Sequence, residues 1–232
     1  MKIVLLALLL LAPATAVLPD DAEIIKAQKP SYPLTTCLIS GEELGSGGMK
    51  QVDLVRDGHL VSLCCKGCIK DFDKDPAANL KKIEAAVVAA QSADYPVDTC
   101  VAGGDKLDEN AVNLVVGTKL VKLCCNDCKK IVLAEPSKYL ARVDQAYIAA
   151  QSANYPLDIC PISEHALGDA PVKYLHGTTL VQFCCEDCVG EFEKDPKPLL
   201  AKLAAARAKA PAKEEKPVTA PPKDGHEGHG GH

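Results

Sequence analysis

Cysteine is the residue type whose spacing most clearly indicates chemistry in this sequence. The twelve cysteines form three groups, each with one cysteine followed, after 26 or 23 intervening residues, by Cys-Cys-x-x-Cys. Thiolates are soft ligands that suit Zn(II), Cu(I) and related ions, so each group is a candidate metal site. Spacing alone leaves open which of the two adjacent cysteines is the ligand. The candidate ligands are Cys37, Cys64, Cys65 and Cys68; Cys100, Cys124, Cys125 and Cys128; and Cys160, Cys184, Cys185 and Cys188.

The cysteine groups also show that the chain is internally repeated. The Cys-Cys-x-x-Cys clusters recur every 60 residues, and each group is preceded by a Tyr-Pro dipeptide. A fixed period of this length indicates tandem copies of one structural unit. We divide the chain into repeats at residues 30–94, 95–154 and 155–209. The second repeat is degenerate, because Val132 and Glu135 replace the phenylalanine and aspartate of the other two.

Each repeat contains the same predicted elements in the same order. In the first repeat a glycine-rich loop precedes two β-type runs, 52–55 and 60–63, which an Asp-Gly turn joins into a hairpin. Alternation places Val61 and Leu63 on one face, which we expect to face the core. A short helix is predicted at the cysteine cluster, and a longer one follows Asp75-Pro76, an N-cap aspartate with proline at the first helical position. The predicted fold class is α+β, with three small modules in tandem.

Domains of this size bury little surface. About 60 residues bury only roughly 60% of the surface that their unfolded chain exposes. The sequence has no Trp and only 3 Phe with which to build a core. A metal or a covalent cross-link is therefore expected to hold each module together.

The conserved order within the repeats is cysteine, long hairpin, Cys-x3-Cys, aromatic residue and Asp-Pro. It is carried by Cys64, Cys68, Phe72, Asp75 and Pro76 in the first repeat, and by Cys184, Cys188, Phe192, Asp195 and Pro196 in the third. This order resembles the TRASH/YHS group of small treble-clef-like metal-binding domains, which occur in heavy-metal sensors, transport ATPases and metallochaperone-like proteins. The resemblance covers nearly all of residues 32–209.

The resemblance implies a treble-clef-like arrangement and a specific set of ligands. The implied ligands are Cys37, Cys64 and Cys68 with their equivalents, and the adjacent Cys65, Cys125 and Cys185 are available as a fourth thiol. Related folds often read Cys-x-x-Cys at the first knuckle, whereas this chain has Ser40, Gly103 and Ser163 three residues after the first cysteine of each repeat. The implied function is handling of copper or zinc, or heavy-metal resistance, without enzymatic activity.

Two other interpretations of the cysteines stay open. An exported chain with an even number of cysteines is often a disulfide framework, which would make this a structural or interaction protein. However, 12 cysteines in 232 residues is below the density of disulfide scaffolds, and the clusters are cramped for well-shaped bridges. Cys65-Lys66-Gly67-Cys68 has the spacing of a thiol–disulfide oxidoreductase but lacks the βαβ context of that motif.

The first residues predict export. Lys2 precedes an apolar run from residue 3 to 12, and a small-x-small motif ends at Ala16, as in a secretory signal peptide at residues 1–16. This run is shorter than a bilayer span, and no second candidate follows, so we expect no membrane span after signal removal. The predicted location is periplasmic or extracellular.

The last residues predict a disordered tail with additional metal ligands. From residue 210 to 232 the composition turns to Ala, Pro, Lys and Glu, and the chain ends with His226, His229 and His232 at every third position. Imidazoles on a flexible chain can chelate divalent metals. The net charge of −5 and the pI of about 5.7 lack the basic footprint of nucleic-acid binding. The expected partners are metal ions and a metal transporter or another exported protein.

Overall fold

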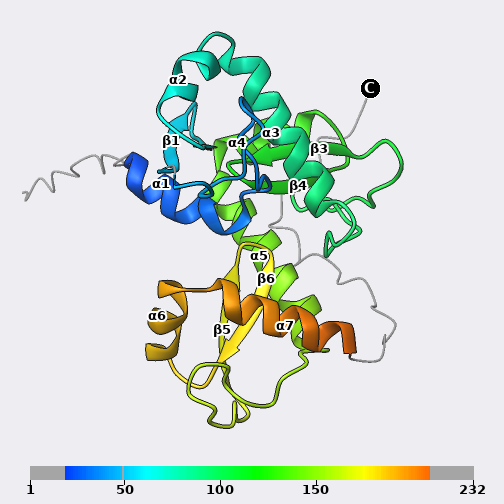
Figure 1. Cartoon of the computed structure of the whole chain (residues 1–232). Helices are drawn as coiled ribbons and strands as arrows, with labels where there is room; N and C mark the ends of the chain where they lie inside the picture. Colours follow the sequence, from blue (N-terminus) through cyan, green and yellow to red (C-terminus); the bar gives the residue numbers. More distant parts are fainter. Residues whose placement is uncertain (1–18, 49, 210–232) are drawn as a thin grey trace, which may run out of the picture.

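The computed structural model of the protein describes residues 19–48 and 50–209. The predicted signal peptide at 1–16 and the predicted tail at 210–232, with His226, His229 and His232, lie outside the described residues. The described part is α+β, and it consists of three similar modules that each combine a two-stranded hairpin with helices (Figure 1). The predicted fold class and the threefold repeat are confirmed.

The elements follow the chain in the same order in every module. A helix, α1 (Asp21–Gln28), and one 3₁₀ turn, η1 (Lys29–Ser31), precede the first hairpin. The modules then contain β1 (Val52–Arg56), β2 (His59–Leu63), α2 (Gly67–Phe72) and α3 (Pro76–Gln91); β3 (Val112–Val116), β4 (Lys119–Leu123), α4 (Asp127–Ala134) and α5 (Pro136–Ser152); and β5 (Val172–His176), β6 (Thr179–Phe183), α6 (Asp187–Lys194) and α7 (Lys197–Lys209).

The hairpin turns have the backbone that their sequences predict. In the first module both turn residues have positive φ, 48° at Asp57 and 75° at Gly58, as a type I′ turn requires. In the second and third modules only the first turn residue, Gly117 or Gly177, has positive φ, which is the pattern of a type II′ turn. Both turn types match the right-handed twist of the paired strands, so the three hairpins are alike despite different turn residues.

The second strand of each hairpin is buried on both faces, whereas the sequence predicts only one core face. Val61 and Leu63 are fully buried as predicted, and Leu60, on the opposite face, is fully buried too. The opposite face is covered by the helix that precedes each module, because α1 lies against β1 and β2, α3 against β3 and β4, and α5 against β5 and β6. The equivalent buried residues are Leu120, Val121 and Leu123, and Leu180, Val181 and Phe183.

A glutamine and a tyrosine from the preceding segment close the edge of each second strand. The Gln28 side chain accepts a hydrogen bond from Leu60 N–H (2.7 Å) and donates one to Gly58 C=O (2.7 Å). Tyr32 Oη accepts from Ser62 N–H (3.2 Å). We call this arrangement the glutamine clasp. It recurs as Gln91 with Leu120 and Thr118 beside Tyr95 with Lys122, and as Gln151 with Leu180 and Thr178 beside Tyr155 with Gln182.

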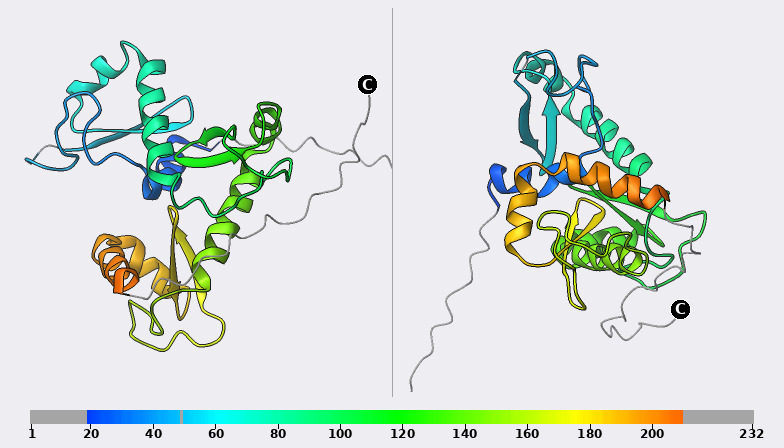
Figure 2. Two further views of the ribbon diagram at one scale, coloured as in Figure 1. Left: turned by 90° about the vertical axis from the view of Figure 1, so that its right-hand side faces the viewer. Right: turned by 60° about the horizontal axis from the view of Figure 1, so that its bottom comes forward.

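The α1–η1 segment also contacts the other two modules. Thr118 Oγ1, in the turn of the second hairpin, donates to Gln28 C=O (2.8 Å). A Cβ on Gly177, in the turn of the third hairpin, would lie 2.5 Å from Pro30 O, so only glycine fits there. Lys26 forms an ion pair with Glu193 of α6 at 3.8 Å. In Figure 2 α1, drawn in blue, accordingly lies where the three modules meet. The contacts of α1 with the first hairpin lie before residue 30, where the sequence places the start of the first repeat.

The helices after the cysteine clusters begin almost where the sequence predicts. Asp75 caps α3 by accepting from Ala78 N–H (3.0 Å), with proline at the first helical position. The same Asp-Pro pattern at Asp195 and Pro196 predicts proline at the first helical position of the third module, which is wrong by one residue, because α7 begins at Lys197. Pro196 C=O accepts a hydrogen bond from Leu200 N–H (3.0 Å), so Pro196 occupies the N-cap position.

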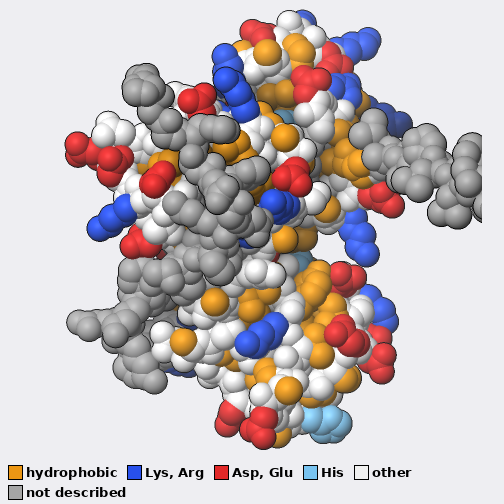
Figure 3. All heavy atoms as spheres, turned by 180° about the vertical axis from the view of Figure 1, so that it is seen from behind, with side chains coloured by type: hydrophobic (Ala, Val, Ile, Leu, Met, Phe, Trp, Pro, Cys, Tyr) orange, Lys and Arg blue, Asp and Glu red, His pale blue; other side chains and the backbone are white. Residues whose placement is uncertain are grey.

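The surface carries charges of both signs. On the face shown in Figure 3, Lys and Arg side chains are interspersed with Asp and Glu rather than gathered in a basic patch. Within residues 19–48 and 50–209, no helix is both long enough and apolar enough to cross a membrane.

We expect Gln91→Ala to destabilise the protein by about 1–3 kcal/mol, because it leaves Leu120 N–H and Thr118 C=O without their partner at a site where Gln91 is only 6% exposed. Chemical unfolding followed by circular dichroism would measure the change. Gln145→Ala, which alters an exposed glutamine of α5, is the control and should change stability by less than about 0.5 kcal/mol. Equal effects of the two substitutions would contradict a structural role of the clasp.

Candidate metal centre

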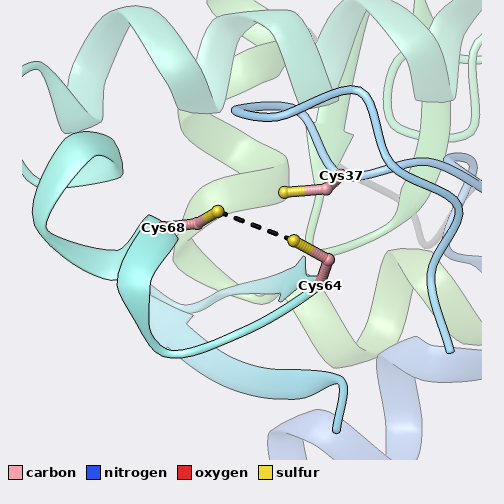
Figure 4. A group of neighbouring side chains, drawn as sticks. All are labelled: Cys37, Cys64 and Cys68. Atoms are coloured by element: carbon pink, nitrogen blue, oxygen red, sulfur yellow. Dashed lines mark hydrogen bonds between the residues drawn. The ribbon is translucent and has the colours of Figure 1, made fainter. Parts of the chain in front are cut away.

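Three cysteines that are distant in the sequence meet at one point in each module. In the first module Cys37 lies in the loop before the hairpin, Cys64 directly follows β2, and Cys68 lies in the first turn of α2. They are 1%, 2% and 8% exposed, and their three Sγ atoms lie within 4.8 Å of one another (Figure 4). We call each such set a cysteine triad. The other triads are Cys100, Cys124 and Cys128, and Cys160, Cys184 and Cys188.

Backbone hydrogen bonds position the first cysteine of each triad. Cys37 N–H donates to Glu42 C=O (2.7 Å) and Gly41 N–H donates to Cys37 C=O (2.8 Å), while Thr36 and Glu43 form an antiparallel bridge. We call residues 36–43, and the equivalent 99–106 and 159–166, the knuckle loop. Because these bonds belong to the backbone alone, the knuckle loop presents its cysteine to the triad before any ion binds.

The structure separates the two adjacent cysteines that the sequence could not distinguish. Cys64 belongs to the triad, whereas Cys65 lies at its rim with Sγ 4.0 Å from that of Cys68. Cys125 and Cys185 are exposed, and each has its Sγ 3.6 Å from the last cysteine of its triad. The geometry therefore favours three ligands per module, of which the first and the last are buried in every module, with a fourth thiol within reach.

The triads combine thiols of opposite acidity. Burial opposes ionisation of Cys37, but hydrogen bonds from Cys64 N–H and from the hydroxyl and N–H of Ser40 outweigh it and lower the pKa to about 6. In the third module the corresponding balance lowers the pKa of Cys160 to about 6. Burial, followed by the neighbouring thiols, raises the pKa of Cys68 to about 12. At neutral pH the first triad therefore holds a thiolate beside a protonated thiol, and a bound cation has to displace that proton.

The rim cysteines are acidic for a different reason. Backbone N–H groups at the start of α2, from Cys68 and Gly67, lower the pKa of Cys65. The same kind of contact at the start of α4 and of α6 lowers the pKa values of Cys125 and Cys185. An exposed thiol with a lowered pKa is a reactive nucleophile and a ready ligand.

The remaining predicted ligands, His226, His229 and His232, lie outside the described residues. All twelve cysteines are free thiols in the structure. Among the described residues, no histidine belongs to a triad. His59 instead bonds to Asp57 C=O (2.9 Å), and the His176 ring packs edge-on against Phe192.

Three polar residues beside the triads were missed by the sequence analysis. Ser40 Oγ lies 3.2 Å from Cys64 Sγ, and Ser163 Oγ lies 3.2 Å from Cys184 Sγ. In the second module Cys124 Sγ donates instead to Asp105 Oδ2, at 3.6 Å. The sequence signals this difference between the modules, because serine or glycine stands where related knuckles have their second cysteine. It does not show which side-chain atom lies beside the triad sulfur instead.

The second triad is as close-packed as the others. Val132, which takes the place of the phenylalanine in the other modules, is fully buried in the core.

Comparisons with protein-family models, curated proteins and solved structures find no match. The chemistry of the triads is therefore the basis for inferring what the protein does.

Metal affinity should rise with pH, because at least the Cys68 proton must leave when an ion binds and the pKa of this thiol is raised to about 12. We expect the apparent association constant for Zn(II) to increase at least about tenfold per pH unit between pH 6 and 8. Competition titrations with a chelator of known pH dependence would measure it. Cys65→Ser should keep this slope, whereas pH-independent binding would show that the triad is not the ligand set.

Proposed function

We propose that the protein is an exported, non-enzymatic binding protein for thiophilic metal ions, Cu(I) or Zn(II), with a role in metal handling or heavy-metal resistance. The observation that carries this proposal is the triad of cysteine sulfurs within 4.8 Å of one another that recurs once in each of three modules. Thiolate sulfur binds both ions strongly. Three sites in one small chain favour storage or carriage of ions over catalysis.

The donor set limits the choice of metal. Three thiolates match a trigonal Cu(I) centre, whereas structural Zn(II) sites are almost always tetrahedral and need a fourth ligand. The rim cysteines, with sulfurs 3.6 to 4.0 Å from the last cysteine of their triads, are available as that ligand. The chain has only two methionines, Met1 and Met49, so it lacks the thioether clusters that could serve an exported copper carrier.

The resemblance to TRASH/YHS domains supports the same proposal. The order of knuckle loop, hairpin and helix around three cysteines is the order expected of a treble-clef-like metal module. The signal-like residues 1–16 support export to the periplasm or the extracellular space, and His226, His229 and His232 offer weaker, nitrogen-based binding. The partner that we propose is a metal transporter or another exported protein that accepts the ion.

The anaerobically reduced protein should bind one thiophilic ion per triad, three in all. To isolate these sites, the three tail histidines are replaced by alanine in every variant. Replacing the last triad cysteine of each module should abolish binding, because it removes a buried thiolate that nothing in the core replaces. Replacing the rim cysteines should leave three Cu(I) ions bound. The triad set combines Cys68→Ser, Cys128→Ser and Cys188→Ser. The rim set combines Cys65→Ser, Cys125→Ser and Cys185→Ser.

Native mass spectrometry and thiol counting would measure both sets of variants. Metal binding should also raise the melting temperature, because ions bind only the folded modules. Six intact disulfides and no uptake of metal in protein taken from its native compartment would contradict the proposal and favour the disulfide framework.

A second candidate, thiol–disulfide exchange, is favoured by one observation. Cys65 is acidic and more exposed, whereas Cys68 is buried and protonated, with the two sulfurs 4.0 Å apart at the start of a helix. This distribution is that of an attacking and a resolving thiol. We expect no insulin reduction above background and no change with Cys65→Ser. Turnover that disappears in Cys65→Ser would instead make exchange the principal activity.

A further inference from the structure

The three knuckle loops share one backbone but differ in the side chains that face their triads. The N–H of each knuckle cysteine donates to the C=O of the residue five positions later, at 2.7 Å in every module; these residues are Glu42, Asp105 and His165. The residue three positions after the cysteine is serine, glycine and serine in turn. Both positions therefore differ between the modules, and the second of them is the position that holds the second cysteine in Cys-x-x-Cys knuckles.

In the outer modules a serine hydroxyl occupies the space beside the triad. Ser40 Oγ and Ser163 Oγ each lie 3.2 Å from the sulfur of the second triad cysteine. A neutral hydroxyl is a weak ligand for a soft ion. The first and third modules consequently present three thiolates and a hydroxyl that hydrogen-bonds to one of them.

In the second module no side chain fills this space, and two sulfurs and a carboxylate oxygen close around it. A Cβ on Gly103 would lie 3.2 Å from Cys124 Sγ, 3.3 Å from Asp105 Oδ2 and 3.4 Å from Cys128 Sγ. Three donor atoms thus surround the place that a side chain fills in the other modules. Cys100 Sγ is held nearby by a hydrogen bond from Gly103 N–H at 3.2 Å. Asp105 is exposed, so its side chain can turn toward an ion without disturbing the core.

We propose that Asp105, rather than the rim cysteine Cys125, is the fourth ligand of the second module and gives it a stronger preference for Zn(II) than the outer modules, whose three triad thiolates suit Cu(I). A carboxylate oxygen completes a tetrahedral site with three thiolates, as Zn(II) requires. Cu(I) is softer and gains little from a carboxylate. This inference rests on the proposed metal-binding function and assigns different ions to sites with the same cysteines.

The test uses the full chain with the outer triads disabled by Cys68→Ser and Cys188→Ser. The rim cysteines Cys65, Cys125 and Cys185 are replaced by serine, and the three tail histidines by alanine, so that no other predicted ligand competes with Asp105. In this background, Asp105→Asn should weaken Zn(II) binding by about tenfold or more, as loss of an oriented metal-site group commonly does. The Cu(I) affinity should change less than about threefold. Co(II) bound to the background chain should show the intense visible bands of a tetrahedral site, and Asp105→Asn should reduce them.

The first module supplies the matched control. In a chain with Cys128→Ser and Cys188→Ser and the same rim and tail replacements, Glu42→Gln should leave both affinities unchanged, because in the first module the Ser40 hydroxyl lies beside the triad sulfur that a carboxylate contacts in the second. Ser40→Gly combined with Glu42→Asp should raise Zn(II) affinity there, which tests the arrangement by gain as well as by loss. Circular dichroism spectra would verify the fold of each variant.

The outcomes separate this inference from the proposed function. Unchanged Zn(II) affinity in Asp105→Asn, or equal losses for Zn(II) and Cu(I), would overturn the role of Asp105 while leaving metal binding by the triads intact. A background chain that keeps its fold yet binds neither ion would overturn the proposed function, and this inference with it.

Discussion

Each module depends on packing three cysteine sulfurs together where its knuckle loop, hairpin and helix meet, and the first and last of the three cysteines are buried. Cys37, Cys64 and Cys68 are members of the first module's hydrophobic core, which contains only one phenylalanine, Phe72. Buried thiolates are costly unless hydrogen bonds or a cation compensate their charge. Backbone N–H groups compensate one thiolate, at Cys37, and a proton keeps Cys68 neutral. A metal ion would satisfy all three sulfurs at once, so the core has a donor site at its centre.

The glutamine clasps make the modules interdependent. Gln91 belongs to the last turn of α3 in the first module but satisfies backbone groups of the second hairpin. Unfolding of α3 would therefore expose Leu120 and leave the edge of β4 unpaired, a state that favours non-native strand pairing. At the first hairpin, α1 supplies the equivalent residue, Gln28. The helix α1 therefore corresponds to the last turns of α3 and α5, which provide Gln91 and Gln151 to the hairpins that follow them.

The sequence was sufficient to predict the period, the three hairpins and both helices of each module, because these depend on turn residues and local alternation. The spacing also predicted that the first cysteine of each repeat lies near the Cys-Cys-x-x-Cys cluster that follows it, as the triads show. It could not predict burial of Leu60, because the cover on that face comes from a preceding helix. Nor could it decide between Cys64 and Cys65, since that choice depends on where the backbone turns after β2. Gln28 and Tyr32 were visible only as part of a repeated seam, and their bonds to the hairpin edge are tertiary contacts.

The three modules separate the residues that fold the site from those that tune it. The triad cysteines pack among core side chains, so their replacement would affect folding and binding together. Ser40, Gly103 and Asp105 lie at the rim, outside the hydrophobic core clusters. Their backbone groups hold the knuckle cysteines, through Ser40 N–H to Cys37, Gly103 N–H to Cys100 Sγ and Asp105 C=O to Cys100 N–H, and a side-chain substitution leaves these groups in place. Substitutions at these positions can alter the ligand set while the hairpin, helices and clasp stay the same. A repeated fold with a constant thiol frame can therefore hold chemically different sites in one chain.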